Sequence, residues 1–296
     1  MLFFFVFLVL PEYSQHYVGA TIDKVERLTS INQPKIVLVG NSSLAFGINS
    51  ELIEEAMGMP VVNLGMHGGL GNAFHEEMAK LNVCKGDIYI ICHTEYSDND
   101  TILDRELACI TLENHIQLWK ILRGKDVWPL LEAVPTYLHK SFNLWIRQEG
   151  NKEINGNYSR KYFNKYGDYI LERQKREIDF TEGMIAAPTI NDTCIDRLNK
   201  LNEYFTNRGA TMVVAAYAIP VCEFTPDETE YETFQAELEE RLDSPVISNF
   251  TEYMLDQDYF YDTQFHLNNE GVDIRTQLLI KDLKRWKNQE GISWYG

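Results

Sequence analysis

Three short segments of the sequence carry residue types that together could perform nucleophilic catalysis. They are Gly40–Ser43, the glycine-rich Asn63–Gly71, and Tyr261–Asn268, which holds both Asp262 and His266. Catalysis by a serine needs a base within hydrogen-bond reach, an acid that orients the base, and N–H donors for the oxyanion. The three segments supply one of each, so the sequence predicts a serine-based acyl-transfer site.

The elements around these segments predict an α/β fold. Ile36–Val39 is a short, β-branched run between Pro34 and Gly40, which is typical of a buried parallel strand. Strands that alternate with helices at short intervals indicate βαβ units and a parallel sheet, whose sites lie at the carboxyl ends of the strands. Ser42 follows such a strand end. We predict strands at 36–39, 61–62, 87–92, 211–216 and 246–247, and helices at 13–30, 49–57, 72–82, 192–208, 228–242 and 269–288.

The stretch 97–190 breaks this alternation. It predicts helices at 104–122 and 126–139, followed by a polar, aromatic run over Asn151–Tyr169. We interpret it as an α-rich insertion that acts as a lid or substrate wall. The remainder of residues 31–296 predicts one flavodoxin-like, three-layer α/β/α domain with a parallel sheet.

The order and content of the three segments resemble the SGNH/GDSL hydrolase superfamily. The family's first block is Gly-Asp-Ser after the first strand, and here it is Gly40-Asn41-Ser42, with Asn in place of Asp. The family's last block is Asp-x-x-His, and here Asp262 and His266 are one residue further apart. The resemblance covers most of the chain outside the insertion. It implies the SGNH hydrolase fold, with Ser42 as nucleophile, His266 as general base and Asp262 as the acid that orients it.

The oxyanion hole is where this sequence departs most from the family. The family's oxyanion glycine maps onto Gly68, but the Asn of its third block has no counterpart in Ile91–Tyr96. An ionised Glu95 cannot donate a hydrogen bond. We therefore expect a hole built from the N–H groups of Ser42 and Gly68, with His67 or Thr94 as a further side-chain donor. The residues expected to bind substrate are Asn41, His67 and Glu95.

This looser pattern is similar to that of the membrane-anchored SGNH-like proteins that act beside membrane-bound O-acyltransferases, including the Dlt-type and alginate-acetylation proteins. The resemblance implies an esterase or acyltransferase that hydrolyses or transfers an O-acyl group, acetyl in the first instance. It also implies two partners, an acylated carbohydrate or cell-envelope polymer and a membrane-bound O-acyltransferase, and no cofactor. The alternative is a catalytically inactive SGNH-like scaffold that binds carbohydrate or such an acyltransferase, which the absent Asn favours.

The N-terminal run Met1–Leu10 is apolar throughout and ends at Pro11. It is shorter than the roughly 20 residues that span a bilayer, and it lacks the basic flank and cleavage site of a signal peptide. It could be an anchor remnant, a signal h-region or a buried first element. We favour the anchor, which makes residues 1–30 an anchor remnant plus linker helix. This predicts a membrane-anchored catalytic domain on the extracytoplasmic side.

Charge and composition exclude some classes of binding partner. The net charge is −17, whereas nucleic-acid binding needs a basic footprint, so we predict no nucleic-acid partner. The same charge disfavours electrostatic docking on anionic lipid heads. No cysteine or histidine spacing matches a metal-ligand pattern, so no metal site is predicted. We expect His67, His75 and His93 to serve in turns or packing.

Overall fold

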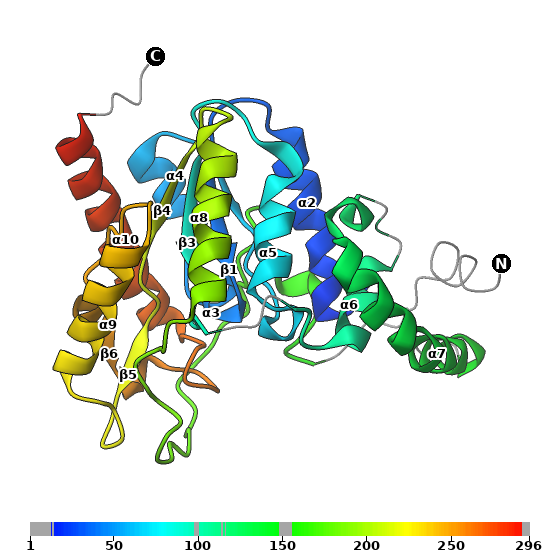
Figure 1. Ribbon diagram of the computed structural model, residues 1–296. Coiled ribbons are helices and arrows are strands. Elements are labelled where there is room, and N and C mark those ends of the chain that lie inside the picture. The colour runs from blue at the N-terminus through cyan, green and yellow to red at the C-terminus, as the bar shows by residue number, and fades with distance from the viewer. Residues whose placement is uncertain are drawn as a thin grey trace.

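A parallel sheet of four strands runs through the centre of the molecule, in the order β2-β1-β3-β4 (Figure 1). The computed structural model describes residues 13, 15–97, 101–113, 115, 117–147 and 156–291. Ile36 pairs with Val61 on one side and with Ile88 on the other, and Ile88 pairs with Thr211. The predicted parallel α/β sheet is confirmed. The strands are β1 (Ile36–Gly40), β2 (Val61–Asn63), β3 (Ile88–Cys92) and β4 (Thr211–Val214).

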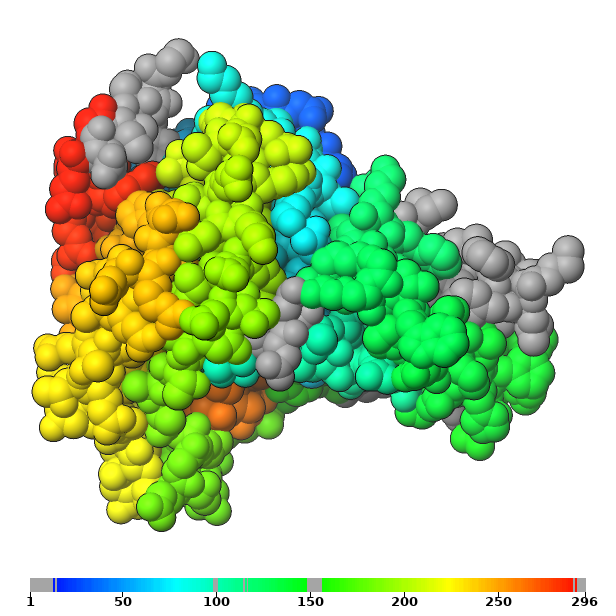
Figure 2. All heavy atoms as spheres, in the orientation of Figure 1, coloured from blue at the N-terminus to red at the C-terminus, as the bar shows by residue number. Residues whose placement is uncertain are grey.

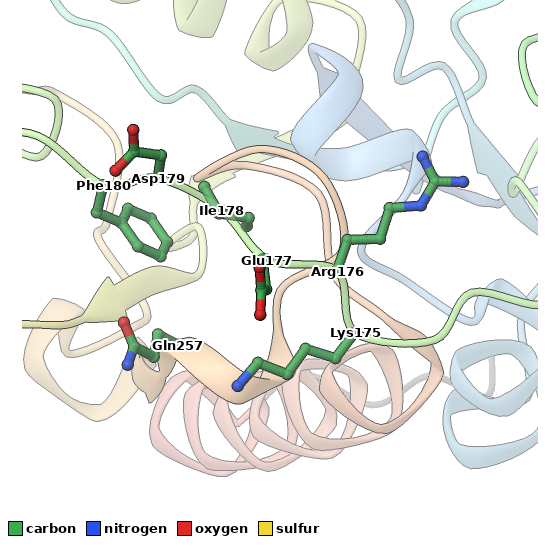
Figure 3. A pocket seen from close by; sticks show the side chains of 7 residues that line it. All are labelled: Lys175, Arg176, Glu177, Ile178, Asp179, Phe180 and Gln257. Atoms are coloured by element: carbon green, nitrogen blue, oxygen red, sulfur yellow. The ribbon is translucent and has the colours of Figure 1, made fainter.

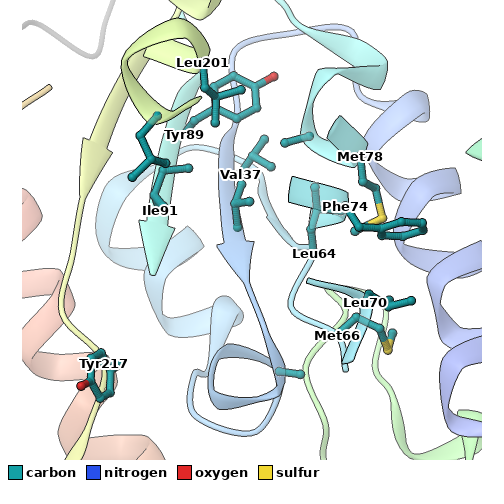
Figure 4. Close-up of a cluster of buried hydrophobic side chains, with 14 of the residues drawn as sticks. Val37, Leu64, Met66, Leu70, Phe74, Met78, Tyr89, Ile91, Leu201 and Tyr217 are labelled. Atoms are coloured by element: carbon teal, nitrogen blue, oxygen red, sulfur yellow. The ribbon is translucent and has the colours of Figure 1, made fainter. Parts of the chain in front are cut away.

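Helices cover both faces of the sheet, because successive strand residues point to opposite sides. Ile36 and Leu38 face the cluster formed with α4 (Ser50–Met57) and α10 (Asn269–Glu290). Val37 and Val39 face the larger cluster. Figure 4 shows part of that cluster, which includes Phe74 and Met78 of α5 and Leu201 of α8. The helices on this second side are α2 (Ala20–Ser30), α5 (Asn72–Ala79), α8 (Asp192–Thr206) and α9 (Glu228–Arg241). The arrangement is compatible with three α/β/α layers.

Local signals account for both ends of α4. The Asn49 side chain accepts a hydrogen bond from the Leu52 N–H at 3.3 Å, so it caps α4, which stops at Gly58 in the left-handed region. The helix predicted to stop at Gly209 ends earlier, at Thr206. Gly209 instead has a φ of +73° in the turn that leads into β4, a conformation that suits glycine.

Several predicted elements differ from those observed. The helix predicted at 104–122 is split into α6 (Arg105–Leu112) and a 3-10 turn, η4 (Leu118–Ile121). The helix predicted at 126–139 is longer, α7 (Gly124–Arg147), and continues through two prolines. Its prolines remove the donors to the carbonyls of Lys125 and Leu131, both exposed residues, so water can replace those bonds.

Further short elements surround the sheet. The segment 246–247 forms only a single bridge, from Val246 to Val214. The parallel pair β5 (Ile219–Val221) and β6 (Met254–Asp256) was not predicted, because β5 contains Pro220 and β6 has no β-branched residue. The remaining short helices are α3 (Ser42–Ala45), η1 (Tyr17–Gly19), η2 (Gly68–Leu70), η3 (Lys80–Asn82), η5 (Arg160–Tyr162), η6 (Phe250–Tyr253) and η7 (Gln257–Tyr259).

The insertion leaves and rejoins the α/β domain at one place. Tyr96 and Ile190 form a parallel bridge, and the Asn191 N–H donates to the Tyr96 carbonyl at 3.1 Å. Between them, α6 and α7 form a lobe at one side of the molecule, green in Figure 2. Of the helices in the described ranges, none is both long and apolar enough to cross a bilayer. The run Met1–Leu10, predicted as an anchor remnant, lies outside the described residues.

Candidate active site

Ser42 is the first residue of α3, a single turn that begins directly after β1. Asn41 caps this turn, because its Oδ1 accepts a hydrogen bond from the Ser43 N–H at 3.0 Å. The Nδ2 of Asn41 donates to Thr94 Oγ1 at 2.7 Å. That bond ties the end of β1 to the end of β3. Ser42 therefore lies partly exposed at the carboxyl edge of the sheet, where the strand order reverses.

Arg275 of α10 donates hydrogen bonds to the α3 turn. This side chain is buried, and its Nη1 donates to the Ser43 carbonyl at 2.6 Å and to Ser43 Oγ at 3.3 Å. Burial lowers the pKa of the Arg275 guanidinium. The contact spans 232 positions of sequence, so no local pattern could have predicted it.

The side chains of Asp262 and His266 are in contact, as the resemblance implies. The Nδ1 of His266 lies 2.8 Å from Oδ1 of Asp262, and the imidazole is buried. The extra residue between them is absorbed in a turn, where Thr263 Oγ1 accepts from the N–H groups of Phe265 and His266 at 3.2 Å. An ionised carboxylate only accepts hydrogen bonds, so in the neutral imidazole Nδ1 carries the proton and Nε2 presents a lone pair.

Tyr158 orients the acid from its other side. Its hydroxyl donates to Oδ2 of Asp262 at 2.8 Å. Burial raises the pKa of Asp262, but the hydrogen bonds from His266 and Tyr158 outweigh burial, so the pKa lies below its usual value. Burial, together with the Asp262 contact, raises the pKa of Tyr158. Asp262 is therefore held as a carboxylate. Sequence reasoning missed Tyr158, whose only signal was its place in the aromatic run of the insertion.

Phe46 places His266 over the turn that carries Ser42. The two rings stack at 4.1 Å between centroids with an interplanar angle of 11°, and Tyr169 stacks on Phe46 at 4.2 Å. Two near-parallel rings at these distances must occupy opposite faces of Phe46. The Phe46 N–H donates to the Ser42 carbonyl at 2.9 Å, so Phe46 lies one turn after Ser42. Phe46 was also missed, because an aromatic residue after a short turn reads as ordinary core.

The predicted Ser42–His266 hydrogen bond is not formed. Among the hydrogen bonds of the described residues, none joins Ser42 Oγ to His266. The two segments meet through Phe46 instead. Catalytic hydrogen bonds are often long in unliganded enzymes and tighten when substrate binds.

Gly68, which is predicted to supply an oxyanion-hole N–H, lies close to the turn that carries Ser42. A Cβ on Gly68 would lie 3.7 Å from Asn41 Cβ, so Gly68 packs against the residue that precedes Ser42. Within the described ranges, neither the Ser42 N–H nor the Gly68 N–H donates a hydrogen bond to protein. Donors of this kind can stabilise an oxyanion without first breaking another bond.

The remaining predicted substrate contacts, His67 and Glu95, take different positions. His67 is exposed, and its Nδ1 accepts from the Gly69 N–H at 2.9 Å. Partial burial of its ring lowers the pKa of His67, and the Asp104 carboxylate opposes this shift. His67 thus borders the site. The Glu95 side chain is exposed, and its backbone carbonyl accepts from Asn72 Nδ2 at 2.9 Å. No hydrogen bond in the described part of the chain joins Glu95 to Ser42, Asp262 or His266.

Behind the β3 end lies a buried charged cluster. The Glu76 carboxylate contacts His93 Nε2 at 2.9 Å and Arg197 Nε at 2.7 Å. Burial opposes ionisation of Glu76, but both partners favour it and lower its pKa to about 2. No group of three or more His, Cys, Asp or Glu side chains in the described ranges is arranged to hold a metal ion.

A hollow of about 550 Å³ lies near the loop that leads to Asp262 (Figure 3). Residues 175–180 and Gln257 line it, and none of the three triad residues does. Arg176, in its wall, stacks over the Tyr261 ring at 4.6 Å and lowers the pKa of Asp262. The hollow thus neighbours the site without containing it.

Comparison with known proteins identifies no relative of this chain. No protein-family model matches the sequence, and neither a curated protein nor a solved structure matches the chain.

Proposed function

We propose that the chain is a serine esterase or O-acyltransferase of the SGNH/GDSL type, with Ser42 as nucleophile, His266 as general base and Asp262 as the orienting acid. One observation carries the proposal. The Asp262–His266 pair, joined at 2.8 Å, stacks through its imidazole on Phe46, one turn from Ser42. A carboxylate, an imidazole and a serine at a strand end are the parts that acyl transfer requires.

In the proposed reaction His266 Nε2 takes the proton of Ser42 Oγ as the oxygen attacks the acyl carbonyl. Asp262 stabilises the imidazolium that forms, and the N–H groups of Ser42 and Gly68 face the developing oxyanion. His266 then returns the proton to the departing alcohol, which leaves an acyl-serine. Water or a sugar hydroxyl, deprotonated by the same imidazole, accepts the acyl group and frees Ser42.

We propose an O-acylated carbohydrate or cell-envelope polymer as substrate, with acetyl as the first acyl group to test. Aromatic faces that can pack on sugar rings support this class, because the half-exposed Tyr158 lies beside the triad. An extracytoplasmic location, anchored by Met1–Leu10, and a membrane-bound O-acyltransferase as partner belong to the same proposal and rest on the sequence resemblance alone.

A fluorophosphonate probe tests the proposal directly, because it reacts with an activated serine. We expect covalent labelling of the intact chain, located at Ser42 by peptide mass spectrometry and absent in Ser42→Ala. Ser43→Ala is the matched control and should still be labelled. Labelling that moves to Ser43 would reassign the nucleophile, and an unlabelled wild-type chain would contradict the enzymatic proposal.

The second candidate is an inactive SGNH-like scaffold that binds carbohydrate or an acyltransferase. Two observations favour it: no Asn of the family's third block is present in Ile91–Tyr96, and Ser42 Oγ forms no hydrogen bond with His266 in the described residues. This candidate predicts no probe labelling together with retained binding of an acetylated polysaccharide. Glycan binding by the Ser42→Ala variant separates the two activities.

A further inference from the structure

The helix α7 carries an exposed apolar face along its whole length. Successive helical residues are about 100° apart, so the exposed apolar side chains of α7 fall within roughly one third of its circumference. The opposite side, with Leu130 and Tyr137, is buried against the rest of the lobe. In Figure 1 the helix lies at the edge of the molecule, away from the sheet. The exposed face consists of Val127, Trp128, Leu131, Phe142, Trp145 and Ile146.

An apolar groove extends the first half of this face. It has a volume of about 230 Å³ and lies between α7 and the segment of α6 and η4. Every side chain that lines it is apolar, including Leu112, Trp119 and Leu131. A contiguous exposed apolar patch on a folded protein is typical of a site that binds a protein, a membrane or a ligand.

The chain that follows the N-terminal apolar run joins the protein at this helix. The Tyr13 N–H donates to Glu113 Oε1 at 3.0 Å, and the hydroxyl of Tyr137, in α7, donates to Oε2 of the same carboxylate at 2.6 Å. The rings of Tyr13 and Tyr137 are also 6.3 Å apart. Only two residues separate Leu10, the end of the apolar run, from Tyr13. The first described residue, three positions after the end of the apolar run, therefore contacts the lobe that carries the exposed face.

We propose that the exposed face of α7 is a membrane-docking surface that lies in the lipid interface. Its two exposed tryptophans and Phe142 are residue types that favour the boundary between headgroups and acyl chains. The helix holds three basic residues, Lys125, Lys140 and Arg147, against two acidic ones, although the whole chain has a net charge of −17. Apolar area, rather than attraction to anionic lipid, therefore drives the docking. The proposal does not depend on the esterase chemistry.

Two pairs of residues in the chain allow a matched test. Val127 and Ile146 on α7 are 46% and 59% exposed, and Val221 and Ile170 elsewhere are 43% and 58% exposed. The double variant Val127→Gln/Ile146→Gln therefore removes the same kind and amount of exposed apolar surface as Val221→Gln/Ile170→Gln. The assay is co-sedimentation of the full 296-residue chain with phosphatidylcholine vesicles, with and without phosphatidylglycerol.

We expect the α7 pair to weaken vesicle binding about tenfold, or about 1.4 kcal/mol, because the substitutions remove half-exposed aliphatic surface that lipid would otherwise bury. The control pair should bind like the wild type. Binding should change little with salt or with the phosphatidylglycerol content, since exposed charges are screened but apolar contacts are not. The same difference should persist when Phe4, Phe5 and Phe7 are replaced by Gln, which separates the helix from the N-terminal run.

Brominated lipid gives a second, position-specific readout. It should quench the wild-type tryptophan fluorescence, and Trp128→Phe/Trp145→Phe should remove most of that quenching. Equal vesicle binding by the two matched pairs, or unchanged quenching in the tryptophan variant, would overturn the proposal. A lipid-free dimer that the α7 pair dissociates would also overturn it, because a second copy would then cover the face.

Discussion

Asn41 and Thr94 are joined by a 2.7 Å hydrogen bond from Asn41 Nδ2 to Thr94 Oγ1, which connects the ends of β1 and β3. In the proposed SGNH resemblance, Asn41 stands where the first block has Asp, and Thr94 lies in the segment where the Asn of the third block is expected. The two departures from the pattern are therefore in contact with each other. An amide at position 41 can both cap α3 and donate to Thr94, whereas a carboxylate could only accept.

This bond predicts a coupled pair. Thr94→Val removes this bond alone, so we expect kcat to fall about tenfold while KM changes little. Asn41→Ala removes the bond together with the cap and should lower kcat at least as much, and the double variant should be no worse than Asn41→Ala. Steady-state kinetics on p-nitrophenyl acetate measure this coupling, and strictly additive losses would show that the two residues act independently.

The triad predicts the largest kinetic effects. Ser42→Ala and His266→Gln should each lower kcat on p-nitrophenyl acetate by about four to six powers of ten, because triad members act as a unit. Both variants should keep a cooperative thermal transition, since neither removes core volume. A His266→Gln variant with near wild-type kcat would assign this histidine a structural role.

Tyr158 predicts a shift in the pH profile. Tyr158→Phe removes one hydrogen bond that favours the Asp262 carboxylate, so the pKa of Asp262 should rise. The carboxylate would then be protonated at a higher pH, and the acid limb of kcat/KM should move upward in pH. Tyr162→Phe, in the same insertion, is the control. Coincident profiles for the two variants would mean that Tyr158 does not act through Asp262.

His75 predicts a loss of stability in acid. It is fully buried, neither ring nitrogen has a hydrogen-bond partner among the described residues, and burial, followed by the nearby His93, lowers its pKa to about 3. The unfolded chain, with a pKa of 6.5 at this residue, therefore binds the proton first, so stability falls as pH drops from 6.5 toward 3.

His75→Leu should remove this dependence. The difference in unfolding free energy between the variant and the wild type should be about 2 kcal/mol more favourable to the variant at pH 5 than near pH 7.5. Urea denaturation at both values measures the difference, and the value near pH 7.5 controls for altered packing. A difference that does not change with pH would mean that His75 binds a proton equally well in the folded and unfolded chains.

The sequence alone determined the α/β class, most elements of the sheet, and the three segments of the candidate site. These features depend on short patterns: β-branched runs predict strands, Asn49 caps a helix, and strand ends locate Ser42. The pairing of Asp262 with His266 was also predictable, because both lie on one loop and the extra residue needed only a turn.

Only the tertiary structure decided how the site is supported. Arg275 reaches Ser43 across 232 positions, and Tyr158 reaches Asp262 across 104. The stacking of Phe46 on His266 likewise joins distant segments. Contacts of this kind produce no periodic or capping pattern in the sequence. Another long side chain with a donor, or another aromatic ring, could have made the same contact. The sequence names the groups that could react, and the packing of remote segments fixes their protonation and orientation.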